Sequence, residues 1–347
     1  CLRIASDRLG ISRFSMSFFF SLILLLLLFR FFLGCHCEKS IKECKRTALA
    51  YKVSYTLPSV LRGNLWGTHY AFRLMTSNWH GHLHICYGGV EGKTQILSSQ
   101  VQAPLKIQRP FFPEGTDVCH SVILHTAGGV VGGDRLSLHL DLQPHSHALI
   151  TTAAAGKIYR STGQEAQQVV NVQVAPSASL EWLPQETIVF DQAQYRQQMR
   201  VDLAPGATWL GWEITRLGRT ARGEQFLAGA WRSHTEVWQE NRPLWLDRQW
   251  LPGSEETFFS PHGLAGHPVV GSLAFVGRSV DSDLIDKIRA TWIGTTGQFG
   301  VTRLQTGLLC RYRGDSTMEV RQWFVAVWAV LRSLYLQRPV CLPRVWS

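Results

Sequence analysis

A pattern of alternating apolar and polar residues that runs into a proline recurs about every 30 residues in the middle of the chain. Its three copies occupy residues 140–147, 172–179 and 201–208, and their prolines lie 32 and 29 residues apart. Alternation with period two is typical of half-buried strands, and Pro followed by small residues marks a turn between them. The repeat therefore predicts a mainly β fold: an elongated, β-helix-like scaffold of stacked strands, formed by hairpins or coils that share one core.

Helical patterns are few and lie in the C-terminal part of the chain. Residues 282–292 can form three helical turns with apolar side chains on one side, and residues 316–319 have capping-box spacing before a long apolar repeat. An amphipathic helix of this kind more often packs on its own domain, but it can also dock on a partner. As a hypothesis, we place partner binding at Phe324, Trp328 and Leu331.

The basic charge of the chain is concentrated in its first fifth. Residues 1–74 hold 11 of the 35 Lys and Arg and 3 of the 25 Asp and Glu, which leaves 24 basic against 22 acidic residues in the remainder. Phosphate neutralisation needs a basic surface, so residues 75–347 do not suggest a nucleic-acid partner.

Residues 14–33 form an apolar run inside the basic segment. Such a run is long enough to span a bilayer and also loosely resembles a signal peptide. The pattern changes to β alternation at Met75, so we expect residues 1–74 to be an upstream, non-native extension, with an anchor or signal as the alternative. Residues 75–347 are the predicted β domain with its C-terminal helical region.

Two glycine-rich segments raise the question of nucleotide binding. Residues 88–94 come close to a phosphate-binding loop, but the residues that follow favour a strand over a helix, so a hairpin turn is expected. The second segment holds Gly128, Gly129, Gly132 and Gly133, and Asp134 follows it. A carboxylate repels phosphate, so this loop is either the lining of a narrow polar passage or a tight turn with Asp134 paired to an arginine.

Cysteine and histidine spacing gives no local metal signature. The chain has no Cys-x-x-Cys pair, and Cys86, Cys119, Cys310 and Cys341 are scattered, as is typical of a protein from a reducing compartment. The histidines at 80, 82 and 84 would share one face of a strand, as would those at 145 and 147. Imidazoles suit nickel or zinc, but exposed or singly hydrogen-bonded histidines are the favoured interpretation.

A series of motifs in a fixed order resembles the family of urease accessory proteins called UreD or UreH. The resemblance covers about residues 79 to 346, and the motifs are residues 104–115, 119–120, 128–134, 150–152, 157–160, 180–186, 211–213, 217–219 and 343–346. One departure is Thr126-Ala127, where many members of the family have Pro-Pro.

The resemblance implies a maturation factor that is not an enzyme and holds no tightly bound cofactor. Proteins of this family look like β scaffolds that join UreF and the GTPase UreG, dock on apo-urease in the cytoplasm, and help nickel in transit to reach its site. It also implies an internal polar route, for which the matching positions are Asp134, Glu213 and, less closely, Asp247. A membrane-tethered β binding domain and a nucleotide-binding protein are the alternatives.

Overall fold

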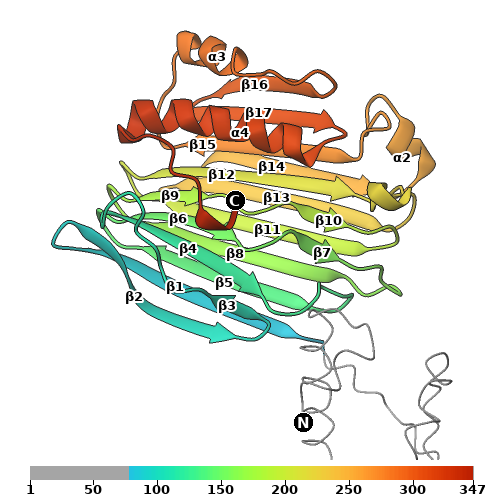
Figure 1. Cartoon of the computed structure of the whole chain (residues 1–347), viewed down its shortest axis with the longest axis horizontal. Helices are drawn as coiled ribbons and strands as arrows, with labels where there is room; N and C mark the ends of the chain where they lie inside the picture. The colour runs from blue at the N-terminus through green and yellow to red at the C-terminus, as the bar shows by residue number, and fades with distance from the viewer. Residues whose placement is uncertain (1–77, 347) are drawn as a thin grey trace, which may run out of the picture. The chain divides into compact units, whose positions relative to one another are not determined.

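The computed structural model describes residues 78–346, which form two β-sheets with helices near the C-terminus (Figure 1). Sheet A runs in the spatial order β14 (Arg242–Pro252), β13 (Ala230–Gln239), β11 (Gln194–Leu203), β8 (Ala166–Val174), β5 (Arg135–Leu142), β1 (His80–Val90) and β2 (Lys93–Gln102). Sheet B runs β16 (Gln298–Leu304), β17 (Gly307–Gly314), β15 (Val269–Val276), β12 (Thr208–Leu217), β9 (Ser179–Trp182), β6 (His147–Thr152), β4 (Val118–His125) and β3 (Leu105–Ile107). Two short strands of sheet B, β7 (Gly156–Ile158) and β10 (Thr187–Val189), pair with each other, and β10 also pairs with β12.

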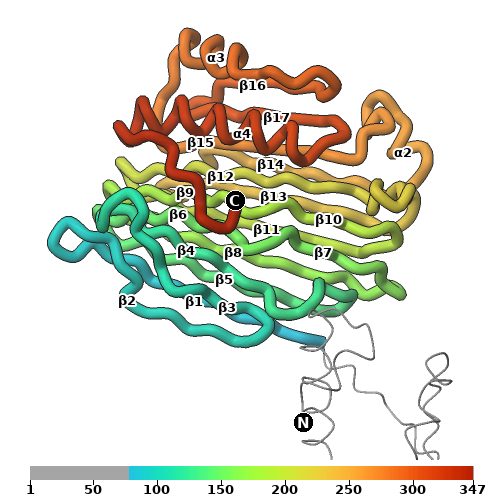
Figure 2. The backbone as a smooth tube through the Cα atoms, viewed as in Figure 1, coloured from blue at the N-terminus to red at the C-terminus, as the bar shows by residue number. Residues whose placement is uncertain are grey.

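The chain winds through the two sheets as stacked parallel coils, which Figure 2 lets the reader follow along the backbone. Strands β5, β8 and β11 of sheet A each pass through one turn into β6, β9 and β12 of sheet B. This architecture is a β-solenoid. The predicted fold of stacked strands is therefore confirmed, and the strands are stacked as coils and not as hairpins.

The sequence repeat also matches the strand register. Leu140 pairs with Val172, and Val172 pairs with Val201. These are the first residues of the three predicted copies, and the copies therefore stack residue on residue. Alternate side chains face inward, as in β5, where Leu136 and Leu138 are buried.

The turns between the sheets have one conformation. In the first copy the amide of Ser146 donates to the carbonyl of Gln143, with Pro144 and a positive-φ His145 between them. A proline at the second position and positive φ at the third define a type II turn. Ser177 and Gly206 also have positive φ at the equivalent positions. Proline and a residue that tolerates positive φ thus fix the width of every coil.

The near-match to a phosphate loop forms a hairpin turn. Strand β1 ends at Val90, strand β2 begins at Lys93, and Glu91 and Gly92 both have positive φ between them. This is a type I′ turn, which joins antiparallel strands. A strand and not a helix follows the glycines, so the alternative of nucleotide binding at this segment is wrong.

Helices α3 (Ser282–Arg289) and α4 (Thr317–Leu331) pack on the face of sheet B that points away from sheet A (Figure 1). Helix α2 (Glu255–Phe259) lies at one end of the coils, and its Phe258 belongs to the core between the sheets. The single turns are η1 (Thr220–Arg222), η2 (Arg332–Leu336) and η3 (Arg344–Trp346). One hydrophobic core lies between the sheets and a second lies under α4. The indole of Trp212 on β12 contacts Phe324 of α4 and Trp346 at the C-terminus, with ring centres 6.1 and 5.4 Å apart.

Both predicted C-terminal helices form, with shorter bounds than expected. The side chain of Ser316 accepts the amide of Glu319, as the capping box requires, but the Glu319 carboxylate accepts from Tyr312 and from the amide of Thr295. Helix α3 ends at Arg289 and α4 ends at Leu331, where it widens into a π-helical turn. Predictions about residues 1–74 lie outside the described residues.

Candidate functional site

A cavity of about 340 Å³ lies between the two sheets of the solenoid. Leu138 and Val170 contribute apolar side chains from sheet A, and Trp209 contributes one from sheet B. Gln168 and Gln197, which are paired across β8 and β11, add polar groups to the wall. The hydrophobic core between the sheets therefore contains a cavity whose wall is partly polar.

The cavity reaches the protein surface at one end of the coils. Gly128, Ala154 and Lys157 line it there, and all three are exposed. They belong to the glycine-rich loop and to the short segment that begins with β7.

Glu213 and Asp247 both line the cavity, although they come from opposite sheets. Ser233 donates a hydrogen bond to Oε2 of Glu213 at 2.7 Å, and Thr215 donates to Oε1 at 3.2 Å. Burial and then the negative charge of Asp247 raise the pKa of Glu213. The carboxyl group thus favours its protonated form more than an exposed glutamate does.

Asp247 is the acid of this pair that has a cationic partner. The guanidinium of Arg311 on β17 donates to Oδ1 of Asp247 at 2.6 Å and to the hydroxyl of Ser272 at the same distance. Gln249 donates to Oδ2 of Asp247 at 3.0 Å. The ion pair between Asp247 and Arg311 links the two sheets at the cavity wall. Asp247 therefore has a cationic partner, whereas Glu213 has none among the described residues.

Asp134 occupies a different position from the two cavity acids. Its Oδ1 accepts the amide of Trp79 at 3.1 Å and its Oδ2 accepts the amide of Val131 at 3.0 Å. It is not among the residues that line the cavity. Asp134 holds the glycine-rich loop through backbone amides, and no arginine among residues 78–346 forms an ion pair with it, unlike in the predicted tight turn. The structure does not bring Asp134 together with Glu213 and Asp247.

The glycines of this loop divide into two pairs. Gly128 and Gly129 line the mouth of the cavity, whereas Gly132 and Gly133 do not. A Cβ on Gly132 would meet the side chain of Ser161 and lie 2.6 Å from the backbone oxygen of Gln164. Close packing of the loop on the next coil therefore requires glycine at this position.

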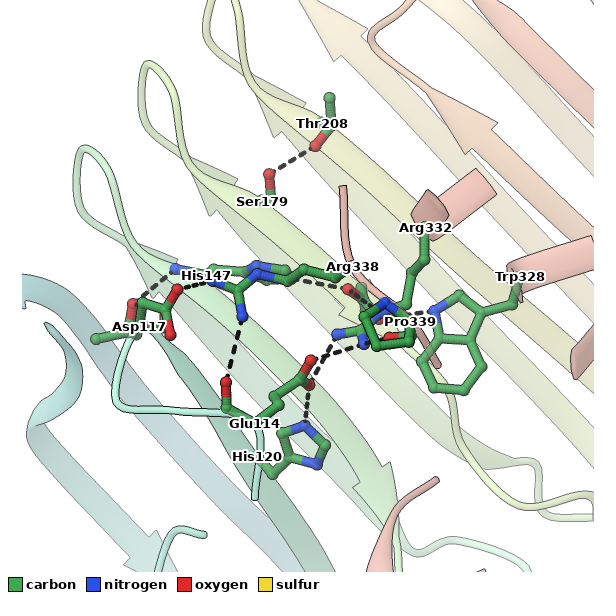
Figure 3. Close-up of polar contacts among 12 residues, drawn as sticks. Glu114, Asp117, His120, His147, Ser179, Thr208, Trp328, Arg332, Arg338 and Pro339 are labelled. Atoms are coloured by element: carbon green, nitrogen blue, oxygen red, sulfur yellow. Dashed lines mark hydrogen bonds and ion pairs between the residues drawn. The ribbon is translucent and has the colours of Figure 1, made fainter. Parts of the chain in front are cut away.

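A second polar cluster, which sequence reasoning missed, lies buried between sheet B and the C-terminal segment (Figure 3). Arg332 is fully buried and its Nη1 and Nη2 donate to the two carboxylate oxygens of Glu114, each at 2.8 Å. The Nε of Arg332 donates to both oxygens of Glu181 on β9 at 3.0 and 3.1 Å. Each carboxylate also bonds a histidine: Glu114 bonds His120 at 2.6 Å and Glu181 bonds His147 at 2.7 Å.

In this cluster, which we call the arginine clamp, one guanidinium lies between two carboxylates, and each carboxylate also bonds a histidine. Burial opposes ionisation of Glu114, but hydrogen bonds from His120 and Arg332 lower its pKa to about 2. Burial likewise opposes ionisation of Glu181, and His147 and Arg332 together hold its pKa below the ordinary value. The clamp therefore joins two coils and the C-terminal segment through an ionised, desolvated network.

A signal for the clamp is present in the sequence. Glu181 stands between the apolar residues Leu180 and Trp182, and Arg332 directly follows the apolar run of the last helix. Charged residues are almost never fully buried unless they are paired, so two opposite charges in apolar segments indicate a buried pair. What the sequence does not give is that these two segments meet.

One group of possible metal ligands is present in the clamp. Within residues 78–346, donor atoms of Glu114, His120 and Cys341 lie within 4.8 Å of one another. Both Glu114 oxygens are already bonded to the guanidinium of Arg332. A fixed positive charge at this distance opposes the binding of a cation, so the group acts as a structural cluster.

The predicted partner-binding residues are part of the second core. Phe324 and Trp328 are fully buried and Leu331 is 1 % exposed. The indole of Trp328 also donates to Glu181 at 2.7 Å. The structure contradicts the hypothesis that a partner binds at these side chains, because all three are buried in the core between α4 and sheet B.

Stacked coils, a covering C-terminal helix and an interior cavity with two acids define the chain as a β-solenoid with a partly polar cavity. The family described as "UreD urease accessory protein" matches residues 80–347. Its curated relatives include the urease accessory protein UreD of Nostoc punctiforme, 62% identical over 79% of this chain and 98% of the relative. The protein of the same name from Synechocystis is 45% identical over 73% and 95% of the two chains. The chain belongs to the UreD family of urease accessory proteins.

Among residues 78–346, none of the helices combines the length and the apolar character needed to cross a lipid bilayer.

Proposed function

We propose that this chain is a scaffold that helps nickel to reach the metal site of urease and performs no bond chemistry itself. In this proposal it acts in the cytoplasm with UreF and the GTPase UreG on apo-urease. Family membership supports the urease part of the proposal. The observation that carries the nickel part is the surface-connected cavity with Glu213 and Asp247 in its wall.

The donor types in the cavity suit a metal ion in transit. Carboxylate, hydroxyl and amide oxygens bind a borderline cation such as Ni²⁺ more weakly than thiolates do, so the ion exchanges readily. None of the four described cysteines lines the cavity. A route with oxygen donors can therefore pass an ion on, whereas clustered cysteines would retain it.

The two acids supply complementary steps. Glu213 favours its protonated form while the cavity holds no cation, since burial raises its pKa. An entering cation lowers that pKa, so the carboxyl group releases its proton and binds the cation as an anion. Asp247 is charge-balanced by Arg311 and adds a second oxygen ligand only if Arg311 moves aside. Nickel passage in this scheme is coupled to the release and return of a proton at Glu213.

Free cysteines are consistent with a cytoplasmic protein. Cys86, Cys119, Cys310 and Cys341 are all unpaired, and burial raises the pKa of Cys119 to about 11. Unpaired and protonated thiols are typical of a reducing compartment.

Affinity capture from cells that express the urease genes tests the scaffold role. The tagged full-length chain should recover UreF, UreG and apo-urease, and deletion of its gene should leave urease without nickel. The purified chain should hydrolyse no GTP unless UreG is added. Urease that acquires its normal nickel content in the deletion strain would overturn the proposal.

A further inference from the structure

A row of potential metal ligands lies on the outer face of sheet A, away from the cavity. His82, His84 and Cys86 occupy alternate positions of β1 and therefore share one face. The neighbouring strand β5 runs parallel to β1, with His84 paired to His139 and Cys86 paired to Asp141. All five side chains are partly exposed. Two adjacent strands thus present three imidazoles, a thiol and a carboxylate within one small area, which we call the histidine patch.

The spacing of the imidazoles suits a shared ion. The ring centre of His139 lies 5.5 Å from that of His82 and 6.2 Å from that of His84. Two imidazoles bound to one ion at about 2.1 Å have ring centres about 5.3 Å apart at the tetrahedral angle, and about 6.5 Å apart only when they lie on opposite sides of the ion. The separation of His82 and His139 is close to the tetrahedral value. His84 must rotate toward the other two rings to join them, and its side chain is partly exposed.

Asp141 is placed to orient one of the ligands. Its Oδ2 lies 2.6 Å from Nε2 of His84, and both side chains are 35 % exposed. A carboxylate bonded to one ring nitrogen leaves the other free to bind a metal and increases its basicity. This is the arrangement commonly seen behind metal-binding histidines.

We propose that the histidine patch is a surface site for one borderline divalent cation, of the class of Ni²⁺, Zn²⁺ or Cu²⁺. His82, His84 and His139 are the ligands, and Asp141 positions His84. Imidazole is a ligand that these ions share, whereas Mg²⁺ and Ca²⁺ prefer oxygen. The site does not depend on the proposed function, because it needs neither urease nor a partner.

Calorimetric titration of the full-length chain with Ni²⁺ tests the site. The double variant His82→Gln/His139→Gln should lose one bound ion per chain, or bind it at least about tenfold more weakly. The control His262→Gln removes an exposed histidine elsewhere on the described surface and should leave binding unchanged. The cavity variant Glu213→Gln separates this site from the interior and should also retain the ion.

Two further readouts keep the test decisive. Asp141→Asn should weaken Ni²⁺ binding about tenfold without loss of the site, since it leaves the three imidazoles in place. X-ray absorption of the bound nickel should show imidazole ligands in the wild type that are lost in the double variant. Equal stoichiometry and affinity in the wild type and the folded double variant would overturn the proposal, as would the absence of any bound nickel.

Discussion

Replacing Arg332 by methionine should be among the most damaging single changes at the C-terminal end of this protein. Methionine keeps much of the apolar stem of arginine but removes the guanidinium, which is fully buried. Its loss would leave the carboxylates of Glu114 and Glu181 desolvated, each with only a histidine as an ionisable partner. Removing one partner from a buried ion network costs about 3–5 kcal/mol.

Arg338→Met is a matched control six residues along the chain. Arg338 pairs with Asp117, in the same connecting segment as Glu114, but both side chains are partly exposed. Ion pairs at the surface contribute about 0–1 kcal/mol. Both variants therefore replace an arginine by methionine and remove an ion pair with the segment that holds Glu114 and Asp117. They differ in how deeply the arginine side chain is buried.

Urea unfolding of the full-length chain, followed by tryptophan fluorescence, measures the difference. Arg332→Met should lower the unfolding free energy by about 3–5 kcal/mol and the melting temperature by about 10 °C. Arg338→Met should change the free energy by less than about 1 kcal/mol. Adding Glu181→Gln to Arg332→Met should restore part of the loss, because it removes one uncompensated charge. Equal effects of the two arginine variants would refute the reasoning from burial.

Two further changes test the loop and the clamp. Gly132→Ala should destabilise the fold by about 1–3 kcal/mol in thermal unfolding, because the new Cβ would lie 2.6 Å from the backbone oxygen of Gln164. The control Gly128→Ala places its Cβ at an ordinary contact distance and should leave the stability nearly unchanged. Acid should weaken the fold between about pH 4.5 and pH 2, since the pKa of Glu114 falls from 4.5 to about 2 on folding and the ionised form is the stabilising one. Urea titrations at pH 5 and pH 3 should show a larger loss for wild type than for Arg332→Met, and equal losses would contradict this assignment.

The coils could be predicted from sequence because each turn carries its own local signals. Proline followed by a residue that accepts positive φ sets the turn, and period-two alternation sets the buried face, so Leu140, Val172 and Val201 fall into register without tertiary information. The hairpin turn at Glu91 and Gly92 could likewise be predicted from its local sequence.

The two sites depend on contacts between distant segments, which local patterns do not encode. Asp247 and Arg311 meet from opposite sheets, 64 residues apart in sequence. Arg332 meets Glu114 across 218 residues. The orientation of α4 could not be predicted either, because its apolar residues are spread around much of its circumference and the sequence does not say which side a sheet will cover.

The nickel content of urease matured with a Glu213→Gln chain tests the central claim most directly. Glutamine keeps the size of Glu213 and one acceptor oxygen, and its amide nitrogen can donate to the other hydroxyl of Ser233 and Thr215, but it cannot exchange a proton for a cation. Glu240→Gln, on the exposed turn between β13 and β14, is the control. We predict intact complexes for both variants and, at limiting nickel, fewer nickel ions per urease for Glu213→Gln alone. Equal nickel content for wild type and Glu213→Gln at every nickel concentration would contradict a route through the cavity.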